Sequence, residues 1–370
     1  MKNTTYFLNI FSFKNIQKRI FFIYLLIFFS LLSNYACDTT ESYKDIPAGK
    51  RNYIWSIDSV DYKSISGVIQ LESIWGSSPS DVWGANGDAA DVRDCFWHFD
   101  GIKWARATEG TPITEYTGNK VIYSVWGTAQ NNVWAFGRKI NQGYVSAFIM
   151  HYDGNLWTDV TPTNLASLIA PLYCVYGISE NNIWVGGYEY VINYNGNSWT
   201  TYKIADSLIV GSISGNGKFI YANAYSPWGK NIQSIYLFSN NEFSLVDQTT
   251  DQELKFAGLI WVNSNEINSF INGMVSANLN NDGTINNLGW NRIFTTSTFF
   301  TERFVQSSKN VFAVGQWNLV YHFNGIDWSK IDINVVNHTV DPHALFWGVW
   351  TNGKEVFISD TQNGVIYHGK

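Results

Sequence analysis

The chain has 370 residues, a net charge of −6 and an aromatic content of 17%, with 17 Trp, 21 Tyr and 24 Phe. Because only 15% of the residues are charged and so many are large and apolar, this composition excludes a disordered chain. The three cysteines are too few for a disulfide-built scaffold, and their spacing matches no zinc site or CxxC pair.

The first 36 residues have the pattern of an export signal. Four basic residues and no acid lead into an apolar run at 20–32, which as a helix spans about 20 Å, less than the hydrocarbon core of a membrane. The run is followed by Ala36-Cys37, which resembles the lipobox of bacterial lipoproteins. The resemblance implies cleavage before Cys37 and acylation of its thiol. Ordinary secretion and an uncleaved anchor are the alternatives.

Residues 37–51 are polar and without periodicity, and they are predicted to form a tether. Removing residues 1–36 removes four of the 24 basic residues and none of the 30 acidic ones, which takes the net charge from −6 to −10. A surface this acidic repels phosphate backbones, so a nucleic-acid partner is not expected. The predicted location is the bacterial cell envelope, with a lipid anchor at the outer membrane.

One pattern of aromatic residues recurs from residue 71 onward. Two aromatics eight residues apart enclose a polar turn, and in the four clearest copies an Asp-Gly or Asn-Gly pair follows before the last apolar segment, whereas the copies near residues 211, 258 and 346 are weaker. The spaced pairs are Trp75 and Trp83, Trp126 and Trp134, Tyr176 and Trp184, and Phe304 and Phe312. Asp-Gly and Asn-Gly between apolar runs are strong hairpin signals, so each copy is predicted to be a four-stranded antiparallel sheet.

Such sheets have two apolar faces and free edges, which a closed ring of stacked sheets buries and protects. Copies begin near residues 71, 122, 172, 211, 258, 301 and 346, and the last one lacks a fourth strand. Residues 52–57 contain the tryptophan expected of that strand. The sequence therefore predicts an all-β, seven-bladed β-propeller over residues 52–370, in which the N-terminal strand completes the last blade.

The blocks at 74–77 and 81–83, and at 125–128 and 132–137, resemble the tryptophan-rich propeller repeats of exported bacterial proteins, whose functions are largely uncharacterised. This resemblance implies the fold and says little about activity.

Metal and catalytic candidates have structural interpretations. Four histidines fall at one repeat position and are predicted to be repeat features: His98, His151, His322 and His368.

The loop with His338, Asp341 and His343 contains residue types that can bind a metal ion, but Pro342 precludes a helical face that would align them. Residues 278–284 match the opening of a calcium loop, but Gly289 stands where a glutamate is required. No metal or cofactor is expected, no catalytic residue is assigned, and Cys95 and Cys174 are expected to be unpaired.

Loop lengths indicate where function lies. The second connection within each blade and the connections between blades are long and variable, and in a four-stranded meander both emerge on one side of the ring. The residues of this side predicted to bind a ligand are Arg93, Tyr116, Tyr144, Tyr188, Tyr225, Trp228, Trp317 and His343.

Exposed aromatics among polar groups suit a glycan or a protein partner, so the sequence favours a binding or scaffold module. The alternative is an envelope polysaccharide hydrolase or lyase with its site at the mouth of the propeller channel. A purely structural subunit, which would bury an apolar patch against a neighbour, is a third possibility. An enzyme should show converging titratable groups with shifted pKa values near the ring axis, and a binder should show an aromatic platform.

Overall fold

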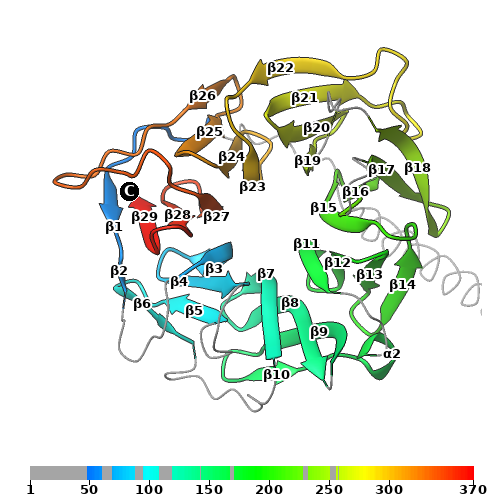
Figure 1. The fold of residues 1–370 in the computed structure, drawn as a ribbon, viewed down its shortest axis with the longest axis horizontal. Helices are drawn as coiled ribbons and strands as arrows, with labels where there is room; N and C mark the ends of the chain where they lie inside the picture. The colour runs from blue at the N-terminus through cyan, green and yellow to red at the C-terminus, as the bar shows by residue number, and fades with distance from the viewer. Residues whose placement is uncertain are drawn as a thin grey trace, which may run out of the picture. The chain divides into compact units, whose positions relative to one another are not determined.

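The computed structural model describes residues 48–60, 69–87, 95–107, 119–141, 143–166, 171–227, 232–250, 256 and 258–370. The compact unit Ala48–Lys370 consists of seven β-sheets arranged around one axis (Figure 1). The predicted seven-bladed β-propeller is therefore confirmed. Among the described residues, no helix is both long and apolar enough to span a membrane.

Blades 1 to 3 are three of the four blades whose sequences match the repeat pattern most closely. Blade 1 comprises β2 (Ser59–Val60), β3 (Leu71–Ser78), β4 (Asp81–Asn86), β5 (Phe96–Phe99) and β6 (Lys103–Arg106). Blade 2 comprises β7 (Asn119–Ala129), β8 (Asn132–Asn141), β9 (Tyr144–Tyr152) and β10 (Trp157–Asp159), and is followed by the short helix α2 (Thr163–Ala166). Blade 3 comprises β11 (Leu172–Ser179), β12 (Asn182–Gly187), β13 (Tyr190–Tyr194) and β14 (Trp199–Lys203).

The remaining blades complete the ring. Blade 4 comprises β15 (Ile209–Gly215), β16 (Ile220–Tyr225), β17 (Gln233–Ser239) and β18 (Glu242–Thr249). Blade 5 comprises β19 (Leu259–Val262), β20 (Glu266–Ile271), β21 (Gly273–Asn278) and β22 (Asn291–Thr295). Blade 6 comprises β23 (Phe300–Ser307), β24 (Asn310–Gly315), β25 (Leu319–Phe323) and β26 (Trp328–Lys330). Blade 7 comprises β27 (Phe346–Thr351), β28 (Val356–Asp360), β29 (Val365–Gly369) and β1 (Trp55–Ile57).

The aromatic spacing of eight residues has a direct structural cause. In blade 1, Trp75 lies opposite Trp83 across the two innermost strands, because eight residues is the separation that this tight hairpin places in register. The equivalent aromatics of blades 2, 3 and 6 are cross-strand partners in the same way. The recurring aromatic side chains then pack between blades. For example, the ring centroid of Trp83 in blade 1 lies 5.3 Å from that of Trp157 in blade 2.

The ring closes where the first described strand meets the last one. β1 pairs antiparallel with β29, with Trp55 opposite Gly369 and Ile57 opposite Tyr367, as the sequence predicts. The chain then continues to blade 1, where β2 pairs parallel with β6. Blade 1 therefore has five strands rather than the four expected, because the segment that closes blade 7 also covers the outer edge of its neighbour.

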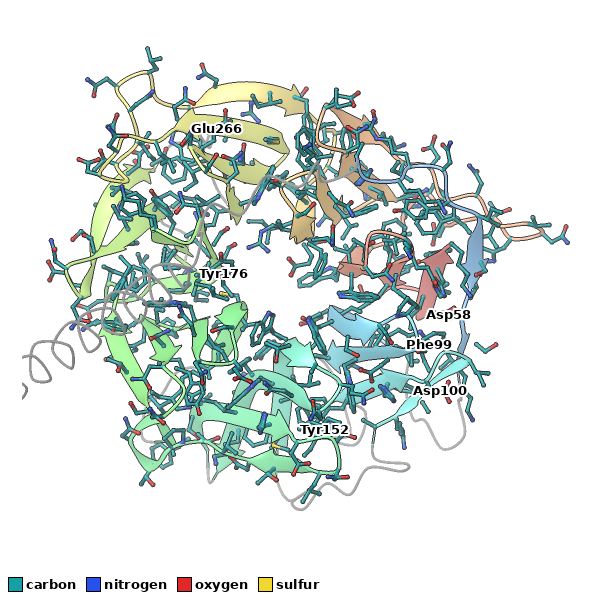
Figure 2. All side chains as sticks on the ribbon, turned by 180° about the vertical axis from the view of Figure 1, so that it is seen from behind. Asp58, Phe99, Asp100, Tyr152, Tyr176 and Glu266 are labelled. Atoms are coloured by element: carbon teal, nitrogen blue, oxygen red, sulfur yellow. The ribbon has the colours of Figure 1, made fainter. Side chains whose placement is uncertain are left out.

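Buried polar contacts hold this closure. The Asp58 carboxylate accepts a hydrogen bond from the indole nitrogen of Trp104 in blade 1 at 3.0 Å and pairs with His368 Nδ1 in blade 7 at 2.9 Å. The other ring nitrogen of His368 lies 2.8 Å from a Glu355 oxygen. Figure 2 shows Asp58 beside Phe99 at this junction. We call these contacts, together with those of Gly49 and Arg51 on blade 6, the closure seam.

The two sides of the ring differ in their connections. On one side, the turn that precedes the outermost strand lies against the turn between the two innermost strands. A Cβ on Gly101, for example, would come 2.8 Å from the Cβ of Ser80. We call this side the short-turn face and the opposite one the variable-loop face. Residues 138–146, expected to be a loop of that face, instead extend the β8–β9 hairpin, because Lys139 pairs with Ser146 and Ile140 with Val145.

Candidate functional site

A β-bulge recurs near the start of the innermost strand of most blades. In blades 1 to 4 one residue is skipped between paired neighbours, as Tyr123 is skipped between Ile122 and Ser124. Blades 6 and 7 have the same irregularity. A bulge re-aims the side chain of the extra residue relative to its neighbours on the strand. The skipped residues are Glu72, Tyr123, Tyr173, Gly211, Thr301 and, in blade 7, Trp347 with Gly348.

Tyrosines from adjacent blades meet at this level, at the variable-loop end of the ring axis. The rings of Tyr123 and Tyr173 lie 5.1 Å apart with an interplanar angle of 43°. Burial raises the pKa of the Tyr173 hydroxyl, the Arg138 guanidinium opposes this, and Tyr188 adds to it. Burial also raises the pKa of Tyr225, with further contributions from Tyr173 and Cys174. We call Tyr123, Tyr173, Tyr188 and Tyr225 the axial tyrosine cluster.

A glycine makes room for one member of the cluster. Gly211 occupies the bulge position in blade 4, and a Cβ there would come 2.8 Å from Tyr225 Cε1. Where blades 2 and 3 place a tyrosine on the innermost strand, blade 4 leaves space that the ring of Tyr225 fills from the second strand. The same level is thus occupied by aromatic rings from three consecutive blades.

Tyr188 is held by a rigid loop. Its neighbour Glu189 has a φ of 67°. The backbone N–H of Glu189 donates to Leu208 O at 2.8 Å. The Glu189 carboxylate also accepts a hydrogen bond from the Ser207 N–H at 2.7 Å. A residue other than glycine tolerates the left-handed conformation when its surroundings fix it in this way. The position of Tyr188 is therefore determined before any ligand arrives.

Unpartnered polar atoms lie near the axial tyrosine cluster. Arg138 Cζ is 5.9 Å from the Tyr123 ring centroid, and its Nε is buried with no hydrogen-bond partner among the described residues. The same is true of Gln233 Oε1, from the residue paired with Tyr225. Buried donors and acceptors are normally satisfied, so these atoms mark places where a bound group can supply the missing partner.

One arginine crosses between blades nearer the middle of the axis. Arg303 of blade 6 donates from Nε to Ile260 O at 2.6 Å and from an Nη to Ile213 O at 3.0 Å, which joins blades 4, 5 and 6. Its other Nη lies 3.8 Å from a Glu302 oxygen. Burial raises the pKa of the Glu302 carboxyl, and Arg303 opposes that rise. Tyr176 lies near this arginine, at the inner edge of the ring (Figure 2).

The predicted ligand-binding residues are brought together in part. Tyr188 and Tyr225 join the axial tyrosine cluster. Trp317, 58% exposed, faces the ring of His343 at 6.5 Å, because Asn318 N–H donates to Ala344 O and brings their two loops together. Tyr144 is exposed at the tip of the β8–β9 hairpin. Arg93, Tyr116, Trp228 and the predicted lipidation residue Cys37 lie outside the described residues.

The histidines of the repeat make similar contacts. Three of them bond to the side chain that begins the second strand of their blade, as His98 does to Asp81 at 2.7 Å and His151 to Asn132 at 2.8 Å, whereas His368 bonds to Glu355, just before that strand, and to Asp58. The loop histidines diverge, since His343 faces Trp317 whereas His338 lies 3.5 Å from the Tyr367 hydroxyl. Within the described ranges no three His, Cys, Asp or Glu side chains are grouped to hold a metal ion.

The two other sequence candidates have ordinary contacts. In the calcium-like stretch, the Asp282 carboxylate accepts from the Thr284 N–H at 3.0 Å and from its hydroxyl at 2.7 Å, which are the bonds of a tight turn. The thiol of Cys95 donates to Lys120 O at 3.4 Å, and that of Cys174 donates to Val210 O at 3.5 Å.

The sequence reasoning missed Tyr123, Tyr173 and Arg138. A signal for the two tyrosines was present, since each directly precedes the repeated block that begins Ser124-Val125 or Cys174-Val175. From the sequence pattern, both tyrosines are predicted to lie in a strand, with side chains that pack against a neighbouring blade. The bulge that turns them toward the axis is not visible in the pattern.

Comparisons with known proteins support the fold. No family model matches the sequence, and no curated protein matches it. Among solved structures, YCF48 bound to D1 peptide has a TM-score of 0.58 and 12% identity, covering 87% of this chain and 97% of that one. YCF48 from Cyanidioschyzon merolae has a TM-score of 0.54 and 14% identity, covering 85% of this chain and 98% of that one. The extracellular domain of a putative hybrid two-component system from B. thetaiotaomicron has a TM-score of 0.58 and 12% identity, covering 86% of this chain and 42% of that one. At these identities the similarity shows the propeller fold alone.

Proposed function

We propose that this protein is a lipid-anchored binding or scaffold module of the bacterial envelope that recognises a protein partner through an extended peptide segment at the variable-loop face. The observation that carries the proposal is the axial tyrosine cluster with the unpartnered Nε of Arg138 beside it. Aromatic rings with polar tips and a guanidinium form the kind of centre that dominates binding energy in protein interfaces.

The chemistry of the cluster suits a peptide. The rings offer apolar area to side chains, while the tyrosine hydroxyls, Arg138 Nε and Gln233 Oε1 offer donors and an acceptor to a backbone. The neighbours are compatible with such a role: one is a propeller bound to a peptide, and another is the extracellular part of a putative bacterial two-component system.

A glycan is the second candidate partner. The exposed indole of Trp317 next to His343 offers a flat apolar surface with a polar group at its edge, which suits a sugar ring. This pair lies in blade 6 and in the connection to blade 7, whereas the axial tyrosine cluster belongs to blades 2 to 4. Variants in the two places can therefore separate the two candidate partners.

The alternative function, a polysaccharide hydrolase or lyase, has weaker support. Glycoside hydrolysis generally needs two carboxyl groups on opposite sides of the scissile bond. Glu302 has a raised pKa, as a general acid would, but its charged neighbour is Arg303, which also ties three blades together. These contacts favour a structural role for Glu302 and Arg303.

Membrane attachment through acylated Cys37, at the outer membrane, is the other part of the proposal. It is supported by the basic start of the chain, the apolar run at 20–32 and the Ala36-Cys37 pair. Several acyl chains on one cysteine would hold the protein at a membrane far better than a single chain would.

The test is a peptide and glycan array probed with the protein expressed from its full-length sequence and extracted from membranes. We expect peptide binding that falls about tenfold or more for Tyr173→Ala, the loss expected of a central interface residue. Tyr194→Phe is the control, because its hydroxyl donates to Gly196 O in a turn of the short-turn face and should leave binding unchanged. No binding on either array, together with turnover of a polysaccharide, would favour the enzyme instead.

A further inference from the structure

Three aliphatic side chains are almost fully exposed near the place where the N-terminal segment joins the ring. Ile54 is 81% exposed, Ile326 is 81% exposed and Val336 is 83% exposed. We call these three residues the N-terminal rim. Single exposed apolar side chains are normal on soluble proteins, so their grouping has to be established from the contacts around them.

Backbone pairing places Ile54 and Val336 on adjacent segments. Trp55 and Val335 form a parallel bridge, and both side chains pack toward the core of blades 6 and 7. Because side chains alternate along an extended segment, Ile54, the residue before Trp55, faces away from that core. Val336 and Asn337, the latter with a φ of 60°, form the tip of a tight turn in which His338 N–H donates to Val335 O. Figure 1 shows the connection from β26 to β27 extending outward beside β1.

Ile326 is joined to the same region by an ion pair. Its neighbour Asp327 bonds to Arg51 at 2.9 Å, and Arg51 lies three residues before Ile54. The other exposed carboxylate of this part of blade 6, Asp332, is paired with Lys330 at 3.3 Å. Asp327 and Asp332 are therefore each paired with a cation, and Lys50 adds a positive charge next to them.

The described chain begins at this rim. Gly49 N–H donates to Lys309 O at 3.2 Å and to Asn324 O at 3.3 Å, both in turns of blade 6. Eleven residue steps lead from the predicted lipidation residue Cys37 to Ala48. At about 3.5 Å per extended residue they span at most about 39 Å, so an anchor at Cys37 would limit how far Ala48 and the N-terminal rim beside it can lie from the lipid surface.

We infer that the N-terminal rim rests on the lipid surface to which the chain is anchored, with its aliphatic side chains in the headgroup region. This inference depends on the anchoring part of the proposed function. Isoleucine and valine contribute hydrophobic contact and need no hydrogen-bond partner, which suits the interface of a bilayer. Three such side chains bind membranes weakly by themselves, but a short tether gives them a high effective concentration at the surface.

The inferred contact orients the whole ring. With blades 6 and 7 against lipid, blade 3 lies on the opposite side of the ring (Figure 1). The axial tyrosine cluster, built on blades 2 to 4, then lies on the side of the axis away from the lipid-facing blades and remains accessible to a partner at the variable-loop face. The same arrangement makes the protein a spacer that holds this site at a set distance from the lipid.

The test attaches an environment-sensitive fluorophore at one position at a time in the full-length protein, using Ile54→Cys, Val336→Cys and, as the control, Ile178→Cys. Ile178 is also aliphatic and exposed, at 44%, but belongs to blade 3. Of the described native thiols, Cys95 is buried, and burial raises the pKa of the Cys174 thiol to about 12, so neither competes for the label. The protein is reconstituted into vesicles of phosphatidylethanolamine and phosphatidylglycerol that carry a lipid-attached quencher, and iodide serves as the aqueous quencher.

We expect the labels at Ile54 and Val336 to be quenched by lipid about threefold or more strongly than the label at Ile178, and to be shielded from iodide. Equal lipid quenching at all three positions, in protein that floats with the vesicles, would overturn the inference and leave the anchor intact. Labels shielded from both quenchers would show a second copy or another protein on the rim, which also overturns it. Failure to float would contradict the anchor and the inference together.

Discussion

At the centre of the closure seam, the buried side chains of Asp58 and His368 have polar partners, whereas near the axial tyrosine cluster several buried atoms have none among the described residues. Asp58 pairs with both Trp104 and His368, and His368 also contacts Glu355. By contrast, the Nε of Arg138 is buried without a hydrogen bond. Fully satisfied buried groups stabilise one conformation, and unsatisfied ones are places where a ligand can add a bond. Arg51 Nε and His322 Nδ1, in the blade 6 part of the seam, are also unpartnered within the described ranges, so we expect the Asp58 and His368 pair itself to provide stability and the axial tyrosine cluster to provide recognition.

The largest effect is expected at the closure seam. Asp58→Ala removes the partner of two buried donors and leaves His368 paired with Glu355 alone, so we expect a loss of about 3–5 kcal/mol in the free energy of unfolding. Chemical denaturation measures it. Asp332→Ala, which removes an exposed carboxylate, is the control and should leave the midpoint unchanged. A loss at position 58 as small as that of the control would show that the seam does not hold the ring.

A second prediction for the seam concerns pH. Burial, with a smaller effect of Arg51, lowers the pKa of His322 to about 4 from its ordinary 6.5. The unfolded chain therefore binds a proton before the folded one does, so this residue makes stability fall as the pH drops from about 6.5 towards 4. The effect amounts to at most about 3 kcal/mol.

His322→Asn copies the residue that blade 3 has at this position, Asn193, and should flatten the slope of stability against pH in that interval. Denaturant titrations at several pH values provide the measurement. An unchanged slope in the variant would assign the acid sensitivity to other groups.

The axial tyrosine cluster should affect binding more than stability. In Gly211→Ala, the new methyl group would meet the ring of Tyr225 and push it from its place, so we expect partner affinity to fall about threefold to tenfold. Stability should change by less than about 1 kcal/mol, since the ring can move into solvent.

A double-mutant cycle tests the cause of that loss. If Gly211→Ala acts through Tyr225, it should have no further effect in a chain that already carries Tyr225→Leu. Additive losses from the two substitutions would show that Gly211 serves another purpose.

The smallest effect is expected at Glu302. Because burial raises its pKa above the ordinary 4.5, the stabilising contribution of the protonated carboxyl is present at low pH and is lost as the pH rises through the folded pKa. Glu302→Gln should therefore be more stable relative to the native chain at neutral pH than at low pH. Melting temperatures of both proteins across this range provide the check, and parallel curves would contradict the shift.

Much of the architecture followed from local patterns. The spacing of eight between aromatics reflects a cross-strand pair, and the tryptophan in 52–57 identified the strand that completes blade 7. The axial tyrosine cluster was found only in part. Tyr188 and Tyr225 belong to connections that looked variable, but Tyr123 and Tyr173 belong to strands whose bulges have no sequence signature.

By itself, the sequence determined the repeat and the number of blades, because these depend on residue spacing and turn chemistry that act within about 45 residues. It also indicated the ring closure, because the last copy lacks a fourth strand and residues 52–57 supply one, although the two paired strands lie at opposite ends of the described ring. Only the tertiary structure decided which residues from different blades meet: Tyr123 with Tyr173, Arg303 with the carbonyls of blades 4 and 5, and Trp55 with Val335. The physical reason is that curvature of the ring and bulges in the inner strands set these contacts, and both arise from packing between blades rather than from the order of residues within one.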